Sequence, residues 1–166
     1  ALGEDNPGIK ITPALLKQAV YAVLFGDVMM QMLYRCRPYE ATSGAANALY
    51  EEYMARARKL APKFNRHNYT KLAREAIRAF DTMPLVGEGT KPRVGVVGEI
   101  LVKFHPTANN HVVDVIEREG CEAVVPGLLD FFLYSMSNAE LQKDELGSSA
   151  TARAGMQEII KLVDWM

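Results

Sequence analysis

Hydrophobic residues in the first part of the chain recur at helical spacing. Thr12 followed by Pro13 predicts a helix start, because a hydroxyl can cap the first turn and proline suits the first helical position. From there apolar residues lie nearly all round the predicted helix, as in a central, buried helix. The pattern continues to about Arg37, and Pro38 ends it because proline supplies no backbone donor.

Two shorter helices are predicted after that break. The first begins near Thr42 or Ser43, and its inward residues fall at helical spacing: Leu49, Tyr53, Ala57 and Leu60. The second covers about Tyr69–Phe80, with these residues inward: Leu72, Ala73, Ala76, Ile77 and Phe80.

The pattern changes after residues 81–92, which contain two prolines and two glycines and form the likeliest internal boundary. Residues 93–98 and 122–126 are short β-branched runs that predict buried parallel strands. A loop over 99–107 and a helix over 109–119 connect them, which makes a βαβ unit. Residues 128–136 are apolar and helical or irregular, and a last helix is predicted over 149–165. The predicted class is α/β: a helical segment, 1–90, followed by a small Rossmann- or flavodoxin-like βαβ unit with parallel strands in 91–166.

Composition narrows the class of protein. Of the 166 residues, 49% are apolar and 23% charged, as in ordinary globular proteins, and the net charge of −1 gives no general case for nucleic acid. The apolar stretch 14–34 is interrupted by charged and amide side chains, which favours a buried helix over a membrane span. No secretory signal is recognisable, so we expect a cytoplasmic protein. The start at Ala1 and the apolar end at Met166 suggest a piece of a longer polypeptide.

Polar residues follow the two predicted strands. In open α/β sheets ligands bind beyond the carboxyl ends of the strands, and a helix start there suits a phosphate or carboxylate. The ligand-binding candidates at this edge are Gly98, Glu99, His105, Asn109, Asn110 and Asp130. Each has a plainer interpretation as a capping or loop residue. Neither a complete dinucleotide fingerprint nor a P-loop is present, so no nucleotide can be named.

Two further groups of residues are candidates. Arg37, Tyr39 and Glu40 cluster where the first helix ends, and can bind a ligand or satisfy the helix end. Residues 55–78 carry eight basic side chains and one acidic one, Glu75, which fits either a solvated helix face or a surface for an acidic or phosphate-bearing partner.

The two cysteines, Cys36 and Cys121, lie far apart in the sequence and near no other metal-ligand pattern. Both are interpreted as small buried residues, and Cys121 is a weak candidate for one ligand of a metal site completed elsewhere. No metal or cofactor is therefore expected in this chain.

Two stretches are more specific than the periodicity. Residues 33–40 (Leu-Tyr-Arg-Cys-Arg-Pro-Tyr-Glu) and 93–110, followed by 120–126 (Gly-Cys-Glu-Ala-Val-Val-Pro), resemble the 2-hydroxyacyl-CoA dehydratase and benzoyl-CoA reductase group. The resemblance is to activase-related proteins akin to activators of (R)-2-hydroxyglutaryl-CoA dehydratase. By this resemblance, that group's helix-break pattern corresponds to residues 37–40, and its strand-edge pattern corresponds to Gly98, Glu99, Asn109, Asn110 and Asp130.

The resemblance implies an anaerobic bacterial system in which an ATP-driven activator passes an electron to a dehydratase. An iron–sulfur cluster is possible in the full-length protein. The chain itself would be a domain, inactive alone, that positions an acyl-CoA or a partner domain. Its partners would be the remaining domains or the dehydratase and activator subunits, and a dimer is possible. The alternatives are a docking module that uses the basic helices of 55–78, and a flavodoxin-like nucleotide-binding domain.

Overall fold

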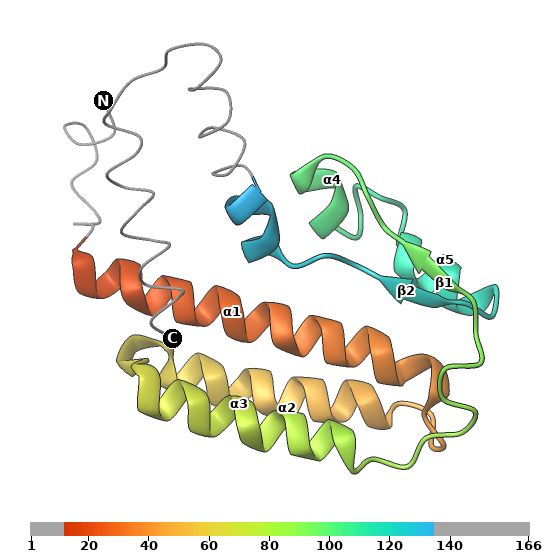
Figure 1. The fold of residues 1–166 in the computed structure, drawn as a ribbon, viewed down its shortest axis with the longest axis horizontal. Coiled ribbons are helices and arrows are strands. Elements are labelled where there is room, and N and C mark those ends of the chain that lie inside the picture. The colour runs from red at the N-terminus through yellow and green to blue at the C-terminus, as the bar shows by residue number, and fades with distance from the viewer. Residues whose placement is uncertain (1–11, 135–166) are drawn as a thin grey trace.

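The computed structural model describes residues 12–134 and combines helices with a two-stranded parallel sheet (Figure 1). The mixed α/β class predicted from the sequence is confirmed at this level. The predicted helix over 149–165 lies outside the described residues.

The first helix, α1, spans Pro13–Cys36, within one residue of the predicted bounds. Thr12 caps it as expected, because its hydroxyl oxygen accepts a hydrogen bond from the Leu15 backbone N–H at 3.1 Å. A 3₁₀ turn, η1 (Arg37–Tyr39), follows at Pro38. By length and composition alone α1 could cross a membrane, a test that the core helix of a soluble protein also passes.

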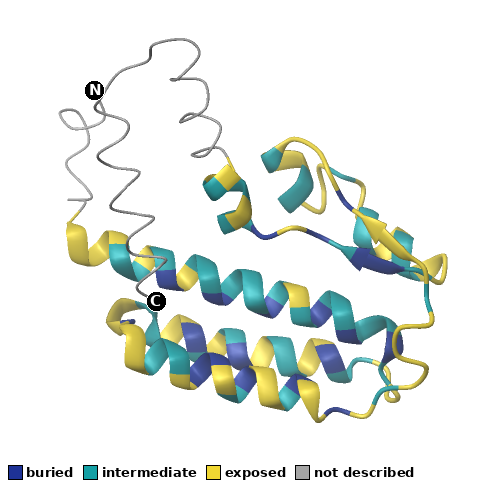
Figure 2. Cartoon of the chain, in the orientation of Figure 1, coloured by how far each residue is buried: buried dark blue, intermediate teal, exposed yellow. Residues whose placement is uncertain are grey.

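Two more helices pack beside α1. These are α2 (Ala45–Leu60) and α3 (Arg66–Asp81), joined by the 3₁₀ turn η2 (Ala61–Lys63). Each of the three helices contacts the other two, and their buried sides face one another (Figure 2). The largest fully buried side chains in this core include Tyr21, Phe25 and Met29 of α1 and Phe80 of α3. Ile77 was predicted to point inward, but it is 42% exposed, because the buried face of α3 is narrower than the apolar pattern suggested.

The sheet consists of β1 (Arg93–Gly95) and β2 (Glu122–Val124), which pair in parallel with Arg93 opposite Glu122. Both strands are shorter than the predicted 93–98 and 122–126, although the Val96 N–H still donates to the Val124 carbonyl at 2.9 Å. The connection contains α5 (Val112–Arg118), which contacts β2. On the other side β2 contacts α1, so α1 is shared by the helical layer and the sheet (Figure 1).

The connection differs from the prediction in two places. Residues 99–107 were expected to be a loop, yet Ile100–Phe104 forms a short helix, α4, because the Glu99 side chain caps it. The next helix was expected from Asn109 but begins at Val112. Asn110 and His111 both have φ of 55°, a left-handed conformation that a right-handed helix excludes. Residues 128–134, after β2, are helical.

Candidate functional site

Glu99, the carboxylate predicted at the strand edge, caps the helix that follows it, α4. It lies just after β1, and one carboxylate oxygen accepts the backbone N–H groups of Leu101 at 2.9 Å and Val102 at 3.2 Å. Gly98, with φ of +142°, makes the turn that brings Glu99 to this position. The geometry therefore gives Glu99 a capping role.

The polar residues between α4 and α5 make hydrogen bonds within their own segment of the chain. The Asn109 amide donates to the carbonyls of Val102 and Lys103, and its oxygen accepts the Val112 N–H at 3.2 Å. His105 accepts the Ala108 N–H through Nδ1 at 3.3 Å. Asn110 contributes a left-handed backbone conformation.

The helix that starts after β2 has two carboxylates at its first turn. Asp130 accepts the Gly127 N–H at 3.0 Å. Asp27 of α1, about one hundred residues away in sequence, accepts the N–H groups of Leu128 and Leu129, each at 2.8 Å. An anionic ligand would meet these carboxylates in place of free N–H groups, so this edge is unsuited to a phosphate.

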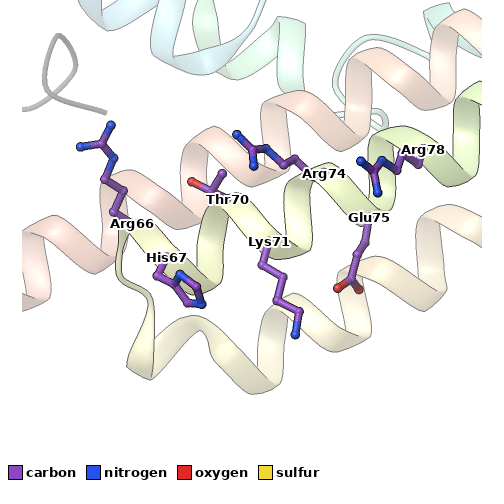
Figure 3. A pocket seen from close by; sticks show the side chains of 7 residues that line it. All are labelled: Arg66, His67, Thr70, Lys71, Arg74, Glu75 and Arg78. Carbon is purple, nitrogen blue, oxygen red and sulfur yellow. The ribbon is translucent and has the colours of Figure 1, made fainter.

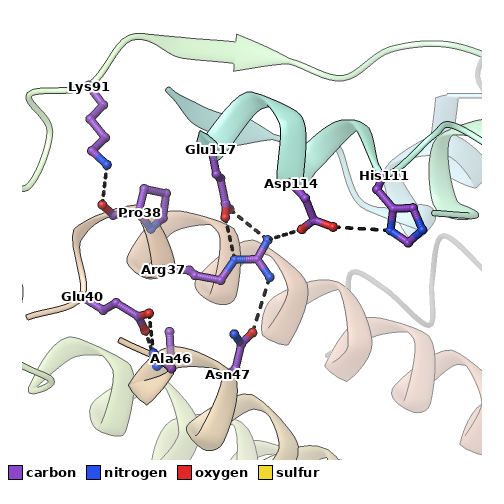
Figure 4. A network of polar contacts seen from close by, with 10 residues as sticks. Arg37, Pro38, Glu40, Ala46, Asn47, Lys91, His111, Asp114 and Glu117 are labelled. Carbon is purple, nitrogen blue, oxygen red and sulfur yellow. Dashed lines mark hydrogen bonds and ion pairs between the residues drawn. The ribbon is translucent and has the colours of Figure 1, made fainter. Parts of the chain in front are cut away.

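The residues at the end of α1 and just after it make three separate sets of contacts, each with a different carboxylate: Glu117, Glu40 or Glu122. Arg37 binds Glu117 of α5 through Nε at 2.7 Å and Nη2 at 3.0 Å, and it also contacts Asp114 (Figure 4). Glu40 caps α2 by accepting the N–H groups of Gly44 and Ala46. Burial raises the pKa of Glu117, and the Arg37 hydrogen bonds offset only part of that rise.

The third contact leads to Glu122, a buried carboxylate that sequence reasoning treated only as the start of a strand. It accepts hydrogen bonds from three elements: Arg35 of α1 at 2.7 Å, the Tyr39 hydroxyl at 3.0 Å and Arg93 of β1 at 3.1 Å. Burial tends to raise the pKa of Glu122, but these donors outweigh it and the net pKa is lowered. The available signal was an acidic residue directly before the apolar run Ala-Val-Val.

One cavity is lined by residues from both groups of candidates, those at the strand edge and those at the end of α1. A hollow of about 270 Å³ between α1 and the α4–α5 segment is lined by Arg37 and Asn109, together with Tyr34 and Lys103. Glu99, Asn110, Asp130, Tyr39 and Glu40 do not line it. Arg37 is already paired with Glu117 and Asp114.

The two cysteines lie in different surroundings. Cys36 is buried in the core, and burial raises the pKa of its thiol; Cys121 is partly exposed. Within residues 12–134, no group of three or more His, Cys, Asp or Glu side chains is placed to hold a metal ion.

The basic segment predicted over 55–78 divides into paired and unpaired cations. On α2, Arg56 forms ion pairs with Glu75 and Glu52, and Arg58 pairs with Glu51. On α3 the side chains of Lys71, Arg74 and Arg78 are exposed, and no carboxylate of the described region pairs with them. They line a pocket along the outer side of α3 together with Arg66, His67, Thr70 and Glu75 (Figure 3).

This unpaired basic face has a simple structural origin. Leu72, Ala73, Ala76 and Phe80 take the buried positions of α3, which leaves the basic residues on the opposite side. We call Lys71, Arg74 and Arg78 the α3 basic face. It is the largest concentration of unpaired charge among the residues singled out above.

Comparisons with protein-family models, with curated proteins and with solved structures gave no match to this chain.

Proposed function

We propose that this chain is a docking module of a 2-hydroxyacyl-CoA dehydratase-like system, and that its α3 basic face binds an acidic surface of a partner domain or subunit. The observation that carries the proposal is the set of three exposed cations, Lys71, Arg74 and Arg78, without a carboxylate partner in residues 12–134. The proposed relation to this family rests on the sequence resemblance in residues 33–40, 93–110 and 120–126.

Docking is favoured over direct positioning of an acyl-CoA by the state of the other candidate residues. Glu99, Asn109 and Asp130 are engaged in capping and turn hydrogen bonds. Binding a ligand through them would require breaking those bonds. The cations of α3 are available without any such cost.

The expected interaction is electrostatic. Three like charges on successive turns of one helix create a local positive potential that speeds association with an acidic surface. Salt reduces this effect, since charges farther apart than about 8 Å are largely screened at physiological ionic strength. Apolar contact is supplied by the exposed Ile77, which lies between Arg74 and Arg78 in the sequence.

The proposal also includes a Rossmann- or flavodoxin-like plan for residues 91–166. The parallel pairing of β1 and β2 around α5 supports that plan. The partner would then hold the chain by its helical layer and leave the sheet free.

The test is co-purification of the tagged chain with the dehydratase and activator subunits of its source, at low and at moderate salt. The variant R74E/R78E changes the α3 basic face. The control K103E/R118E makes the same change in net charge on α4 and α5. We expect R74E/R78E to lose the complex and the control to retain it.

Equal loss in both variants would show a general charge effect and overturn the assignment to α3. Full retention by R74E/R78E would overturn the docking role itself. Circular dichroism of both variants checks that the helices are intact.

A further inference from the structure

A second hollow, of about 430 Å³, lies between α1 and β2 and is distinct from the α3 basic face. Residues 122–126 form one wall, and the other is formed by these residues of α1: Gln31, Met32, Tyr34 and Arg35. Arg93 of β1 also lines the hollow. Its size lies in the range of small-molecule sites. The proposed docking function uses none of these residues.

Two guanidinium groups reach this hollow in fixed positions. Arg35 donates through Nη1 to one oxygen of Glu122, and Arg93 donates through Nε to the other. Because Glu122 is 1% exposed and also accepts the Tyr39 hydroxyl, it is a rigid anchor for both arginines. A shared buried acceptor holds two flexible side chains near each other before any ligand arrives.

Both arginines have donors left over. Arg93 uses only Nε in the described contacts, so both of its Nη groups remain, and its side chain is 63% exposed. The second Nη of Arg35 contacts the exposed Glu88 at 3.4 Å, a long and solvent-screened contact. Planar guanidinium groups with free N–H pairs match the two oxygens of a carboxylate.

The rest of the hollow is mainly apolar. Val124 lies on the same face of β2 as Glu122, because alternate residues of a strand share a face, and Pro126 lines the hollow just beyond the strand. Met32 lines the wall opposite, and the Gln31 amide also lines the hollow. A ligand that fits has an anionic head at the arginine end and a short apolar body.

We propose that this hollow binds a small organic acid, with its carboxylate on Arg35 and Arg93 and its apolar body against Met32, Val124 and Pro126. Glu122 is a positioning residue, which holds the two guanidinium groups. The chain is thereby assigned a small-molecule site separate from its docking face.

The test is a titration of the ¹⁵N-labelled chain with hexanoate, followed by NMR. Amide shifts should localise to residues 122–126 and to α1 around Arg35. Two further probes separate the contributions of the ligand: hexanol has the apolar body without the charge, and inorganic phosphate has the charge without the body. We expect both to bind at least about tenfold more weakly than hexanoate, since each lacks one of the two contacts.

The variant R93Q should weaken hexanoate binding by about tenfold, because it removes one guanidinium group. The control variant R118Q, which replaces an exposed arginine on α5, should bind hexanoate like the unaltered chain. Thermal melting of R93Q separates loss of binding from loss of fold. The variant E122Q should also weaken hexanoate binding, but it should still co-purify with the partner that the α3 basic face binds.

Equal binding of hexanol would overturn the carboxylate assignment, and equal binding of phosphate would overturn the role of the apolar walls. Unchanged hexanoate affinity in a folded R93Q would overturn the site. None of these outcomes bears on R74E/R78E, so the two proposals fail independently.

Discussion

The Tyr39 hydroxyl donates to the Glu122 carboxylate across 3.0 Å and joins residues that lie 83 positions apart in the chain. Tyr39 is the last residue of the 3₁₀ turn η1 that follows α1, and Glu122 is the first residue of β2. The bond is buried at both ends, where water cannot replace it. Together with the Arg37–Glu117 pair it fixes the sheet unit onto α1.

Neutralising Glu122 should reduce stability at neutral pH. The variant E122Q keeps a hydrogen-bond acceptor for Tyr39 but loses the charge that attracts Arg35 and Arg93. Because both arginines are substantially exposed, we expect a loss of about 1–2 kcal/mol in the free energy of unfolding. Urea denaturation at neutral pH measures it, and an unchanged midpoint would contradict the role of Glu122.

Acidification should weaken the unaltered chain through the same group. The folded pKa of Glu122 is lowered from its ordinary value of 4.5, so its contribution is fully present above that value. It is lost as the pH falls below 4.5 and through the lowered pKa. Unfolding free energies measured across this range should therefore fall less in E122Q than in the unaltered chain. Parallel pH profiles would show that Glu122 is not the responsible group.

Gly127 should not tolerate a side chain. A Cβ atom at this position would lie 2.8 Å from Oδ2 of Asp27, the oxygen that accepts the Leu129 N–H, while Oδ1 accepts the Leu128 N–H. G127A is expected to destabilise the chain by roughly 1–3 kcal/mol, as for other overpacked sites.

Gly95 provides the matched control, because nothing lies within 4 Å of its added Cβ. G95A should change the melting temperature little or raise it, since alanine restricts the unfolded chain. Similar destabilisation by both substitutions would refute the specific contact with Asp27.

Two residues of α3, three positions apart, should differ sharply in their cost on truncation. Phe80 is fully buried, and F80A should cost about 3–5 kcal/mol through lost burial and the cavity that remains. Ile77 is 42% exposed, so I77A should cost well under half as much. Chemical denaturation of both variants measures the difference in unfolding free energy. Equal losses would contradict the assignment of Phe80, and not Ile77, to the core face of α3.

The local signals in the sequence predicted much of the fold. Thr12, Pro13 and Pro38 set the bounds of α1, and the β-branched runs located both strands, although β1 is exposed and not buried as predicted. These features act over a few residues, so they are readable without tertiary information. The start of α5 was not, because the left-handed conformations of Asn110 and His111 left no pattern in the hydrophobic spacing.

The candidate site was predicted less well, for a related reason. Glu99 and Asn109 lie near the strand ends as expected, but whether a polar residue caps a helix or binds a ligand depends on its partners. The role of Asp27 depends on Leu128 and Leu129, which are far away in the chain. By contrast, the surplus of basic residues over 55–78 was visible in the sequence, and the structure adds which of them are already paired.

The most direct test of the proposed docking role is co-purification of the proposed partners, dehydratase and activator subunits, with three forms of the chain at low salt: unaltered, R74E/R78E and K103E/R118E. We predict that the unaltered chain and K103E/R118E retain the complex and that R74E/R78E loses it, because only that variant reverses the unpaired cations of α3. A folded R74E/R78E that retains the complex would contradict it.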